Sequence, residues 1–376
     1  NVPDWDASEV NRGRILSDPS AGTETAAVDG WLETPRHLAV DITHDQELLA
    51  YLGTGRNKAR ILIEEQQSPP ENTDTLARMH WLDESVFVRP GDRIILRDSS
   101  DRHLLGCLTV LCADPDRPLT DPEYRTGLRK RHPVRPDTLL SSRLDEQGVT
   151  NLDQLAEGTP FAPDEFEEAL ETQESFRLIE EGWAVDKGWW MQRAETVRER
   201  IDRYHEDHPL KPGIPVENIR SMVPDEQLLD PLLASDPLES IVRDGEFLRR
   251  EDFVPEPSSD QQESVRTLRE ELQSNRLETP DRSTLEEEYS PEIIDYLVRT
   301  GDLVALSEDR IIDRSVFEEL RETVREFLQE HERARLSDLR DHLDSSRKYV
   351  IPLMEYLDRD GLTVRDGDYR YLRDDS

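Results

Sequence analysis

A pattern of helical stretches followed by two short strands recurs along the second half of the chain. The strand pairs lie near residues 184, 247, 311 and 371, about sixty residues apart. Before each pair, apolar residues recur at helical spacing. Helices followed by a β-hairpin, repeated at this length, are typical of winged helices, a variant of the helix-turn-helix. We therefore predict four tandem winged-helix (α+β) domains rather than one large α/β globule.

The last repeat has the clearest pattern. Gly361 is a helix-stop signal, and the short strands Leu362–Val364 and Tyr369–Leu372 flank the turn-forming residues Arg365–Asp368. Pro352 lies inside the predicted helix, where it removes one backbone hydrogen bond and favours a kink. The apolar stripe of that helix follows the i, i+3, i+4, i+7 rule: Val350, Leu353, Met354 and Leu357.

The charge of this last repeat differs from that of the whole chain. The formal net charge of the chain is −37, with 84 acidic and 47 basic residues. Between Ser345 and Arg373, basic residues slightly outnumber acidic ones. Arg347 and Lys348 begin the long helix, where backbone N–H groups add partial positive charge. Nucleic acid is the favoured partner, and the alternative is a protein-binding winged helix whose bases only balance nearby acids.

The region 29–113 has a different pattern, of short apolar or alternating runs separated by Gly, Pro, Asp and Ser. Their number and spacing predict a β-barrel of about six strands. The predicted strands are Leu38–Ile42, Ala59–Ile63, Ala77–Leu82, Val86–Val88, Arg93–Leu96 and Leu104–Leu111. The next segment, Asp114–Pro136, is rich in proline and lacks apolar periodicity, so we predict a linker. Its basic cluster fits either an RNA contact or a solvated connector: Arg125, Arg129, Lys130 and Arg131.

Composition narrows the class of protein further. An acidic surface that is poor in lysine fits a salt-rich, halophilic cytoplasm, because salt screens the self-repulsion. Recurrent apolar periodicity argues against disorder. No signal peptide or membrane-spanning run is apparent, so we expect a cytoplasmic protein without a membrane partner. The chain begins with Asn rather than Met, and we expect a fragment of a longer protein.

Candidate catalytic and metal-binding residues are few. Cys107 and Cys112 lie in one apolar run and are expected to be packed thiols. His205 and His208 have a spacing that metal sites use, but no Cys or third His lies nearby, so a turn-forming role is favoured. No nucleophile triad or glycine-rich phosphate loop is present. We predict no catalytic and no metal site in this chain.

Several stretches resemble one family. Ser346–Tyr349, Met354–Asp358 and Gly361–Arg370 resemble the last winged helix of the bacterial selenocysteine-specific elongation factors, the SelB family. Tyr204–Ile214 resembles the second winged helix of that family. Further upstream, Pro90–Arg97 with Leu105–Leu111 and Leu52–Thr54 is similar to the third domain of the elongation factor Tu family, and Asn1–Leu16 resembles the end of the second β-barrel of translational GTPases.

The resemblance implies a domain order and a function. The implied domains are the end of barrel domain II (1–28), β-barrel domain III (29–115), a linker with winged helix 1 (116–190), and winged helices 2 (191–256), 3 (257–314) and 4 (315–376). It implies a factor that delivers selenocysteinyl-tRNA to the ribosome at recoded UGA codons, while its last winged helix binds a messenger RNA hairpin. GTP, magnesium and GTPase activity are implied for the full-length protein only; this chain is expected to need no cofactor and to be a monomer. The implied RNA-binding residues are Ser345, Ser346, Arg347, Lys348, Tyr349, Arg365 and Arg370.

Two other classes remain as alternatives. A DNA-binding regulator with tandem winged helices is expected to show basic recognition helices in several repeats, whereas only the last repeat is clearly basic here. A protein-interaction scaffold is expected to have no affinity for nucleic acid. The translational barrel that precedes the repeats argues against both alternatives.

Overall fold

The fold was analysed in a computed structural model, which describes residues 15, 17–34, 41–64, 74–179 and 182–373. The chain divides into two compact units. The first comprises residues 1–195 and 227–236, and the second comprises residues 196–226 and 237–376. None of the described helices is long and apolar enough to cross a membrane.

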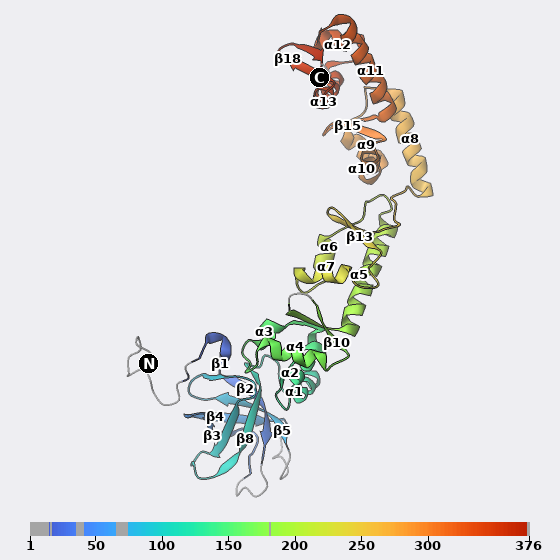
Figure 1. The fold of residues 1–376 in the computed structure, drawn as a ribbon. Coiled ribbons are helices and arrows are strands. Elements are labelled where there is room, and N and C mark those ends of the chain that lie inside the picture. The colour runs from blue at the N-terminus through green and yellow to red at the C-terminus, as the bar shows by residue number, and fades with distance from the viewer. Residues whose placement is uncertain (1–14, 16, 35–40, 65–73, 180–181, 374–376) are drawn as a thin grey trace. The chain divides into compact units, whose positions relative to one another are not determined.

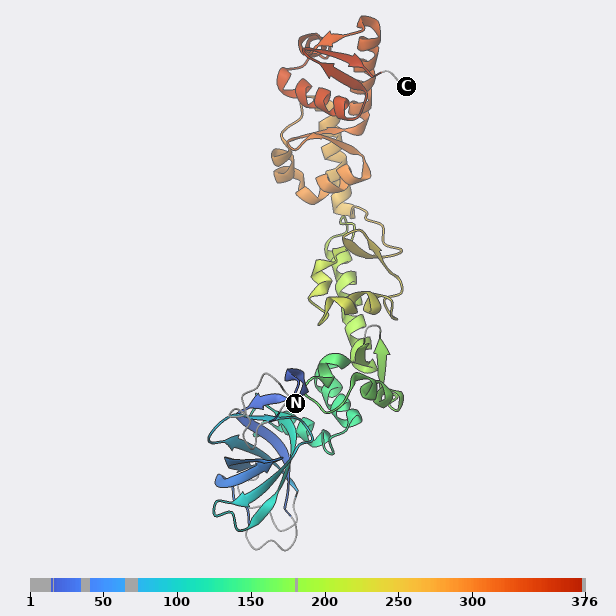
Figure 2. The same cartoon turned by 60° about the vertical axis from the view of Figure 1, so that its left-hand side comes forward.

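A closed six-stranded barrel occupies the first part of the chain (Figures 1 and 2). Its strands pair in the order β2-β5-β4-β3-β7-β8, and every pairing is antiparallel. Alternate side chains point inward and form one apolar core, which includes Val28, Leu32, Ile61 and Leu108. The strand bounds are β2 (Ala27–Glu33), β3 (Gln46–Leu52), β4 (Gly55–Ile63), β5 (Thr75–Trp81), β7 (Arg93–Asp98) and β8 (Leu104–Ala113).

The predicted barrel is confirmed, but two of its strands were missed. β2 and β3 were not expected, and the predicted strand Leu38–Ile42 lies mostly outside the described residues. Val86–Val88 does form a strand, β6, but this strand lies outside the barrel and pairs with β1 (Thr23–Thr25). A short 3₁₀ turn, Pro19–Ala21, precedes β1. The barrel domain therefore begins before residue 29, because β1 and the start of β2 belong to it.

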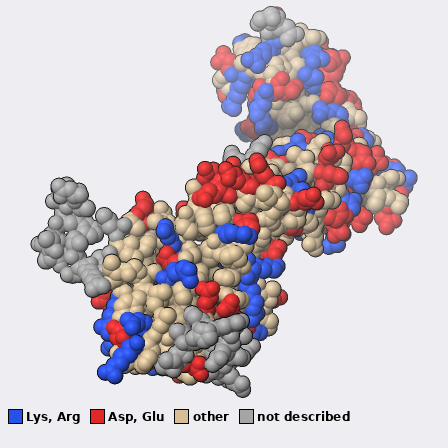
Figure 3. Space-filling view, turned by 60° about the horizontal axis from the view of Figure 1, so that its bottom comes forward, with Lys and Arg blue, Asp and Glu red and all other residues tan. Residues whose placement is uncertain are grey.

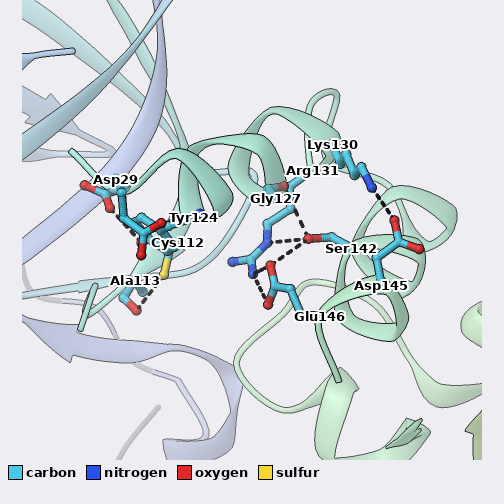
Figure 4. A network of polar contacts seen from close by, with 11 residues as sticks. Asp29, Cys112, Ala113, Tyr124, Gly127, Lys130, Arg131, Ser142, Asp145 and Glu146 are labelled. Carbon is cyan, nitrogen blue, oxygen red and sulfur yellow. Dashed lines mark hydrogen bonds and ion pairs between the residues drawn. The ribbon is translucent and has the colours of Figure 1, made fainter. Parts of the chain in front are cut away.

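The prediction of a linker over Asp114–Pro136 is wrong. Residues Pro122–Lys130 form helix α1, which packs on the barrel through the buried side chains of Tyr124 and Leu128. The Tyr124 hydroxyl donates a hydrogen bond of 2.7 Å to the buried carboxylate of Asp29 (Figure 4). Burial and the nearby negative groups raise the pKa of the Tyr124 hydroxyl, so it remains a donor. The segment is thus an integral part of the barrel domain.

The basic cluster of α1 is neutralised within the first unit. Arg125 and Arg129 both form ion pairs with Glu64, whose side chain is 5% exposed. Lys130 pairs with Asp145, and Arg131 binds Glu146 at 2.9 Å and the Ser142 hydroxyl at 3.0 Å (Figure 4). These contacts leave no reason to assign this cluster to RNA.

Two winged-helix domains follow. Each contains three short strands, arranged β10-β11-β9 in the first and β12-β14-β13 in the second. The first consists of α2 (Pro136–Gln147), β9 (Val149–Asn151), α3 (Leu152–Ala156), α4 (Pro163–Glu171), β10 (Phe176–Ile179) and β11 (Trp183–Asp186). The second consists of α5 (Lys187–Asp207), β12 (Ile214–Pro215), α6 (Glu217–Arg220), a 3₁₀ turn at Glu226–Leu228, α7 (Leu229–Leu233), β13 (Ile241–Asp244) and β14 (Phe247–Arg250).

The third and fourth winged helices share one apolar core in the second unit. Val304, Leu306 and Ile312 of the third domain cluster with Leu353 and Leu357 of the fourth. The third consists of α8 (Ser259–Asn275), α9 (Arg282–Tyr289), α10 (Pro291–Thr300), β15 (Leu303–Ser307) and β16 (Arg310–Asp313). The fourth consists of α11 (Arg314–His331), β17 (Ala334–Arg335), α12 (Leu336–His342), α13 (Arg347–Arg359), β18 (Thr363–Asp366) and β19 (Tyr369–Leu372).

The fourth domain agrees closely with its sequence pattern. All four residues of the predicted stripe on α13 are fully buried. α13 runs continuously through Pro352 and ends before Gly361, which adopts the left-handed φ of 84° that favours glycine. Gly367 and Asp368 form the two-residue turn between β18 and β19, with Gly367 at φ 59°.

Candidate nucleic-acid interface

The exposed start of α13 is the best candidate for contact with nucleic acid. Ser346 occupies the N-cap position, but its side chain makes no capping hydrogen bond. The first backbone N–H groups of a helix have no partner within the helix, and the helix dipole adds positive charge there. The sequence places Arg347 and Lys348 directly after this cap, so side-chain and backbone positive charge coincide.

The two basic side chains at this position differ in their surroundings. Arg347 is exposed, and no carboxylate among the described residues pairs with it. Lys348 is also exposed, but its ammonium lies 3.9 Å from a carboxylate oxygen of Asp281. An exposed pair at that distance contributes little and is readily exchanged for another anion. Arg347 is therefore the freer of the two cations.

Ser345 and Tyr349 are engaged with the third domain. The Ser345 hydroxyl donates to a carboxylate oxygen of Glu278 at 3.1 Å, so it does not cap α13. Tyr349 is half-buried, and the guanidinium carbon of Arg310 lies 4.7 Å from the centre of its ring. Arg310 is itself fixed by Asp281 and by the carbonyl of Thr279. These contacts orient the start of α13.

The two arginines of the wing have different roles. Arg365 on β18 is exposed, and its Nε donates to the Gly367 carbonyl at 3.2 Å. Arg370 on β19 is only 6% exposed, and its Nε donates to Asp358 at 3.1 Å. Arg370 therefore holds the wing against α13 and does not present a free cation. Its assignment to the RNA-binding set is revised to a positioning role.

Of the seven predicted residues, four remain directed to solvent on this domain: Ser346, Arg347, Lys348 and Arg365. This arrangement can bind a phosphate backbone at the helix start and at the wing, the two elements that winged helices commonly apply to nucleic acid. On the face in Figure 3, acidic side chains are numerous and basic ones are dispersed among them, so no broad basic stripe is visible there.

Sequence reasoning missed several residues around this site. Glu278 and Asp281 lie near the start of α13 although they are far from it in sequence, and no local pattern predicts this. Arg333 and Arg335 gather with Tyr369 on the sheet of the fourth domain. The signal for that group was available, because basic and aromatic residues alternate there with buried ones, as strands require.

The other candidates have structural roles. Arg56 and Arg97, two basic residues of the barrel, both pair with Asp101. His205 is buried and stacks on Phe253 with ring centroids 3.7 Å apart, and burial lowers its pKa. His208 binds Glu292 instead. Among the described residues no cluster of His, Cys, Asp and Glu has the arrangement of a metal site, and both cysteines are free thiols.

A closed β-barrel followed by winged helices, the last with a basic helix start, is the arrangement expected of a translation-factor segment. Comparison with known families agrees. Residues 29–117 match the β-barrel domain of the selenocysteine-specific elongation factor, and residues 198–254 and 326–372 match two winged helices of elongation factor SelB. The chain belongs to the SelB family.

Individual relatives support the same family. The selenocysteine-specific elongation factor of Escherichia coli is 25% identical over 318 residues, which cover 80% of this chain and 50% of that protein. The Haemophilus influenzae protein of the same name is 20% identical and aligns with 99% of this chain and 61% of its own length. The chain thus spans about half to three fifths of these relatives' lengths. A crystal structure of a bacterial selenocysteine-specific elongation factor, EF-Sec, shares the fold with a TM-score of 0.56 and 21% identity, over 100% of this chain and 58% of that one.

Proposed function

We propose that this chain is the RNA-handling portion of a factor that delivers selenocysteinyl-tRNA to the ribosome at recoded UGA codons. In this proposal the last winged helix binds a messenger RNA hairpin, and the barrel helps to hold the tRNA. Tethering raises the local concentration of the tRNA at the codon. The names of the relatives and the order of the matched domains support the proposal.

The observation that carries the proposal is the state of Arg347. In a chain with a net charge of −37, this arginine is exposed at a helix start and has no carboxylate partner among the described residues. The guanidinium of Arg347, the neighbouring ammonium of Lys348 and the partial positive charge of the helix start together make a local positive field. A phosphate group is the ligand that fits such a field.

The test is an RNA titration of the whole chain by fluorescence anisotropy, with a hairpin that follows a recoded UGA codon as the probe. Arg347→Ala should weaken hairpin binding by about 1–3 kcal/mol, while thermal stability stays unchanged. The control is Arg243→Ala, an arginine of the second winged helix at the wing position that corresponds to Arg365, and it should leave hairpin binding unchanged. Equal binding by Arg347→Ala and the parent chain contradicts the assignment, and tighter binding of duplex DNA than of the hairpin favours the regulator alternative.

GTP binding belongs, in this proposal, to the longer protein. We expect the chain as given neither to bind nor to hydrolyse GTP, with or without magnesium, because its sequence contains no phosphate loop. Saturable binding of a fluorescent GTP analogue to this chain contradicts that expectation.

A further inference from the structure

The outer face of the sheet in the fourth winged helix carries a cluster of arginine and tyrosine that the proposed hairpin site does not use. Strand β19 pairs with both β17 and β18, and residues opposite each other share a face of the sheet. Arg335 and Asp366 both lie opposite Tyr369, and Val364 lies opposite Tyr371. The alternate residues Ala334, Thr363 and Arg370 are buried, so the tyrosine face points to solvent.

The two arginines of this face lie against one aromatic ring. The guanidinium carbons of Arg333 and Arg335 lie 4.7 Å and 5.0 Å from the centre of the Tyr369 ring. Nη2 of Arg335 also donates to the Tyr369 hydroxyl at 2.8 Å. Neither guanidinium pairs with a carboxylate among the described residues. A planar guanidinium held in this way can stack on a further ring and donate hydrogen bonds at its edges.

The charge of this face limits the kind of ligand that it can bind. Asp366 lies on the same face, and Glu332 precedes Arg333, so two acidic groups accompany the two arginines. The net charge is close to zero, and a duplex backbone is not attracted strongly to such a surface. Stacking does not depend on net charge, and unpaired bases offer rings that stack on tyrosine and arginine.

The second winged helix provides an internal comparison. Its wing reads Val242-Arg-Asp-Gly-Glu-Phe247, and the fourth reads Val364-Arg-Asp-Gly-Asp-Tyr369. Phe247 pairs with Pro215, and Gly213 precedes that short strand, so these positions replace Arg335 and Arg333. Arg249, at the position of Tyr371, donates to backbone carbonyls such as that of Arg250. The same sheet therefore exists there without the two stacked arginines.

From this difference we propose that the outer sheet face of the fourth winged helix, formed by Arg333, Arg335, Tyr369 and Tyr371, binds unpaired RNA nucleotides next to the hairpin. The inference extends the proposed hairpin function by adding a second surface with a different RNA chemistry. The helix start of α13 contacts the hairpin backbone, and the sheet face stacks on bases that leave the stem. The two surfaces are separable by mutation because they share no side chain.

The test compares three RNA probes on the whole chain: a blunt hairpin, the same hairpin with an unpaired uridine tail, and the tail alone. The tail should tighten hairpin binding by about tenfold, the size expected for stacking of one base. The double variant Arg333→Ala/Arg335→Ala should remove that gain and leave the blunt hairpin affinity unchanged. Its backbone contacts are preserved, because the hydrogen bond from Arg335 to Asp338 uses the backbone N–H.

Two further variants separate stacking from charge. Arg335→Lys keeps the positive charge but loses the planar stack, so it should lose most of the gain. Arg249→Ala, on the equivalent face of the second winged helix, should keep all of it. A circular dichroism melt of each variant checks that the fourth domain remains folded.

Three results overturn the inference: a tail that adds no affinity, a double variant that keeps the gain, or a poly-glutamate peptide that competes with the tail as well as oligouridine does. Failure of the hairpin proposal gives a different experimental result. In that case the blunt hairpin does not bind, while the tail alone still binds in a manner that depends on Arg333 and Arg335.

Discussion

The second and fourth winged helices carry nearly the same wing, yet their helices differ. In both wings an arginine side chain reaches the carbonyl of the turn glycine: Arg243 contacts Gly245 at 3.4 Å, and Arg365 contacts Gly367 at 3.2 Å. The helix before the wing is the 13-residue α13 with Arg347 and Lys348 at its start in the fourth domain. In the second domain it is the 5-residue α7, whose first turn contains Asp230. The wing motif alone therefore does not distinguish the proposed RNA site from the second domain, whereas the helix start does.

The largest expected effect concerns the inward side of the two wings. Arg370 is buried against Asp358, whereas Leu248 occupies the equivalent buried position in the second domain. Asp358→Ala should destabilise the fourth domain by about 3–5 kcal/mol, because it leaves a buried guanidinium unpaired. The loss should appear as faster hydrogen exchange in β18 and β19, followed by mass spectrometry.

A second substitution at Arg370 should rescue the stability lost in Asp358→Ala, and it tests the same comparison between the two wings. The double variant Asp358→Ala/Arg370→Leu imitates the apolar position of the second wing and should recover most of the lost protection. Unchanged exchange in the single variant contradicts a structural role for the Arg370–Asp358 pair.

The next effect concerns the outward arginines of the two wings. Arg365→Ala should weaken hairpin binding by about 1–3 kcal/mol, because it removes a contact near the helix start. Arg243→Ala should leave binding unchanged, although its local contact with the turn is nearly identical. A titration in which both variants lose affinity equally would break the distinction between the two domains.

A smaller effect concerns pH and the second domain. Burial lowers the pKa of His205, which faces Asp202, Arg249, Arg250 and Asp252 as well as the Phe253 ring. The neutral form is favoured in the folded state, so the unfolded state binds the proton more readily. The contribution of His205 to the free energy of unfolding is complete above about pH 6.5, the ordinary pKa of a histidine side chain. This contribution is lost as the pH falls below that value. The protection factors of the β14 amides, which compare measured exchange with the intrinsic rate at the same pH, should therefore fall on acidification, and less so in His205→Gln.

The smallest effect concerns the acidic neighbours of α13. Glu278→Gln removes one negative charge near Arg347 and Lys348 while its side-chain oxygen can still accept from Ser345. Hairpin binding should tighten by less than about 1 kcal/mol, since exposed charges are screened within about 8 Å at physiological salt. The control is Glu330→Gln near the end of α11, which should not change affinity. Weaker binding by Glu278→Gln argues that the Ser345 contact matters more than the charge.

These comparisons also show which features the sequence could predict. The stripe on α13 and its wing were predictable because apolar periodicity and turn residues are local signals. β2 was missed because Asp29 and Gly30 interrupt its apolar run. Asp29 is buried only through long-range bonds to Arg78 and Tyr124, whose positions no local pattern reveals.

The residues of the candidate site also divide into those that local sequence signals predict and those that depend on long-range contacts. The exposed cations Arg347, Lys348 and Arg365 follow from their place at a helix start and a turn. The role of Arg370 depends on an ion pair with Asp358, and that of Ser345 on Glu278, which is 67 residues away in sequence. Whether an arginine faces a ligand or a carboxylate is decided by packing, and sequence periodicity does not contain that information.

The shared core of the third and fourth winged helices has a mechanical consequence. Besides the apolar cluster, the Arg359 guanidinium donates to the Leu306 carbonyl at 2.8 Å, so α13 is anchored to the third domain at its end as well as at its start. A force applied to a ligand at the start of α13 is then passed to both domains through their shared core, so the two domains act as one mechanical support for that helix.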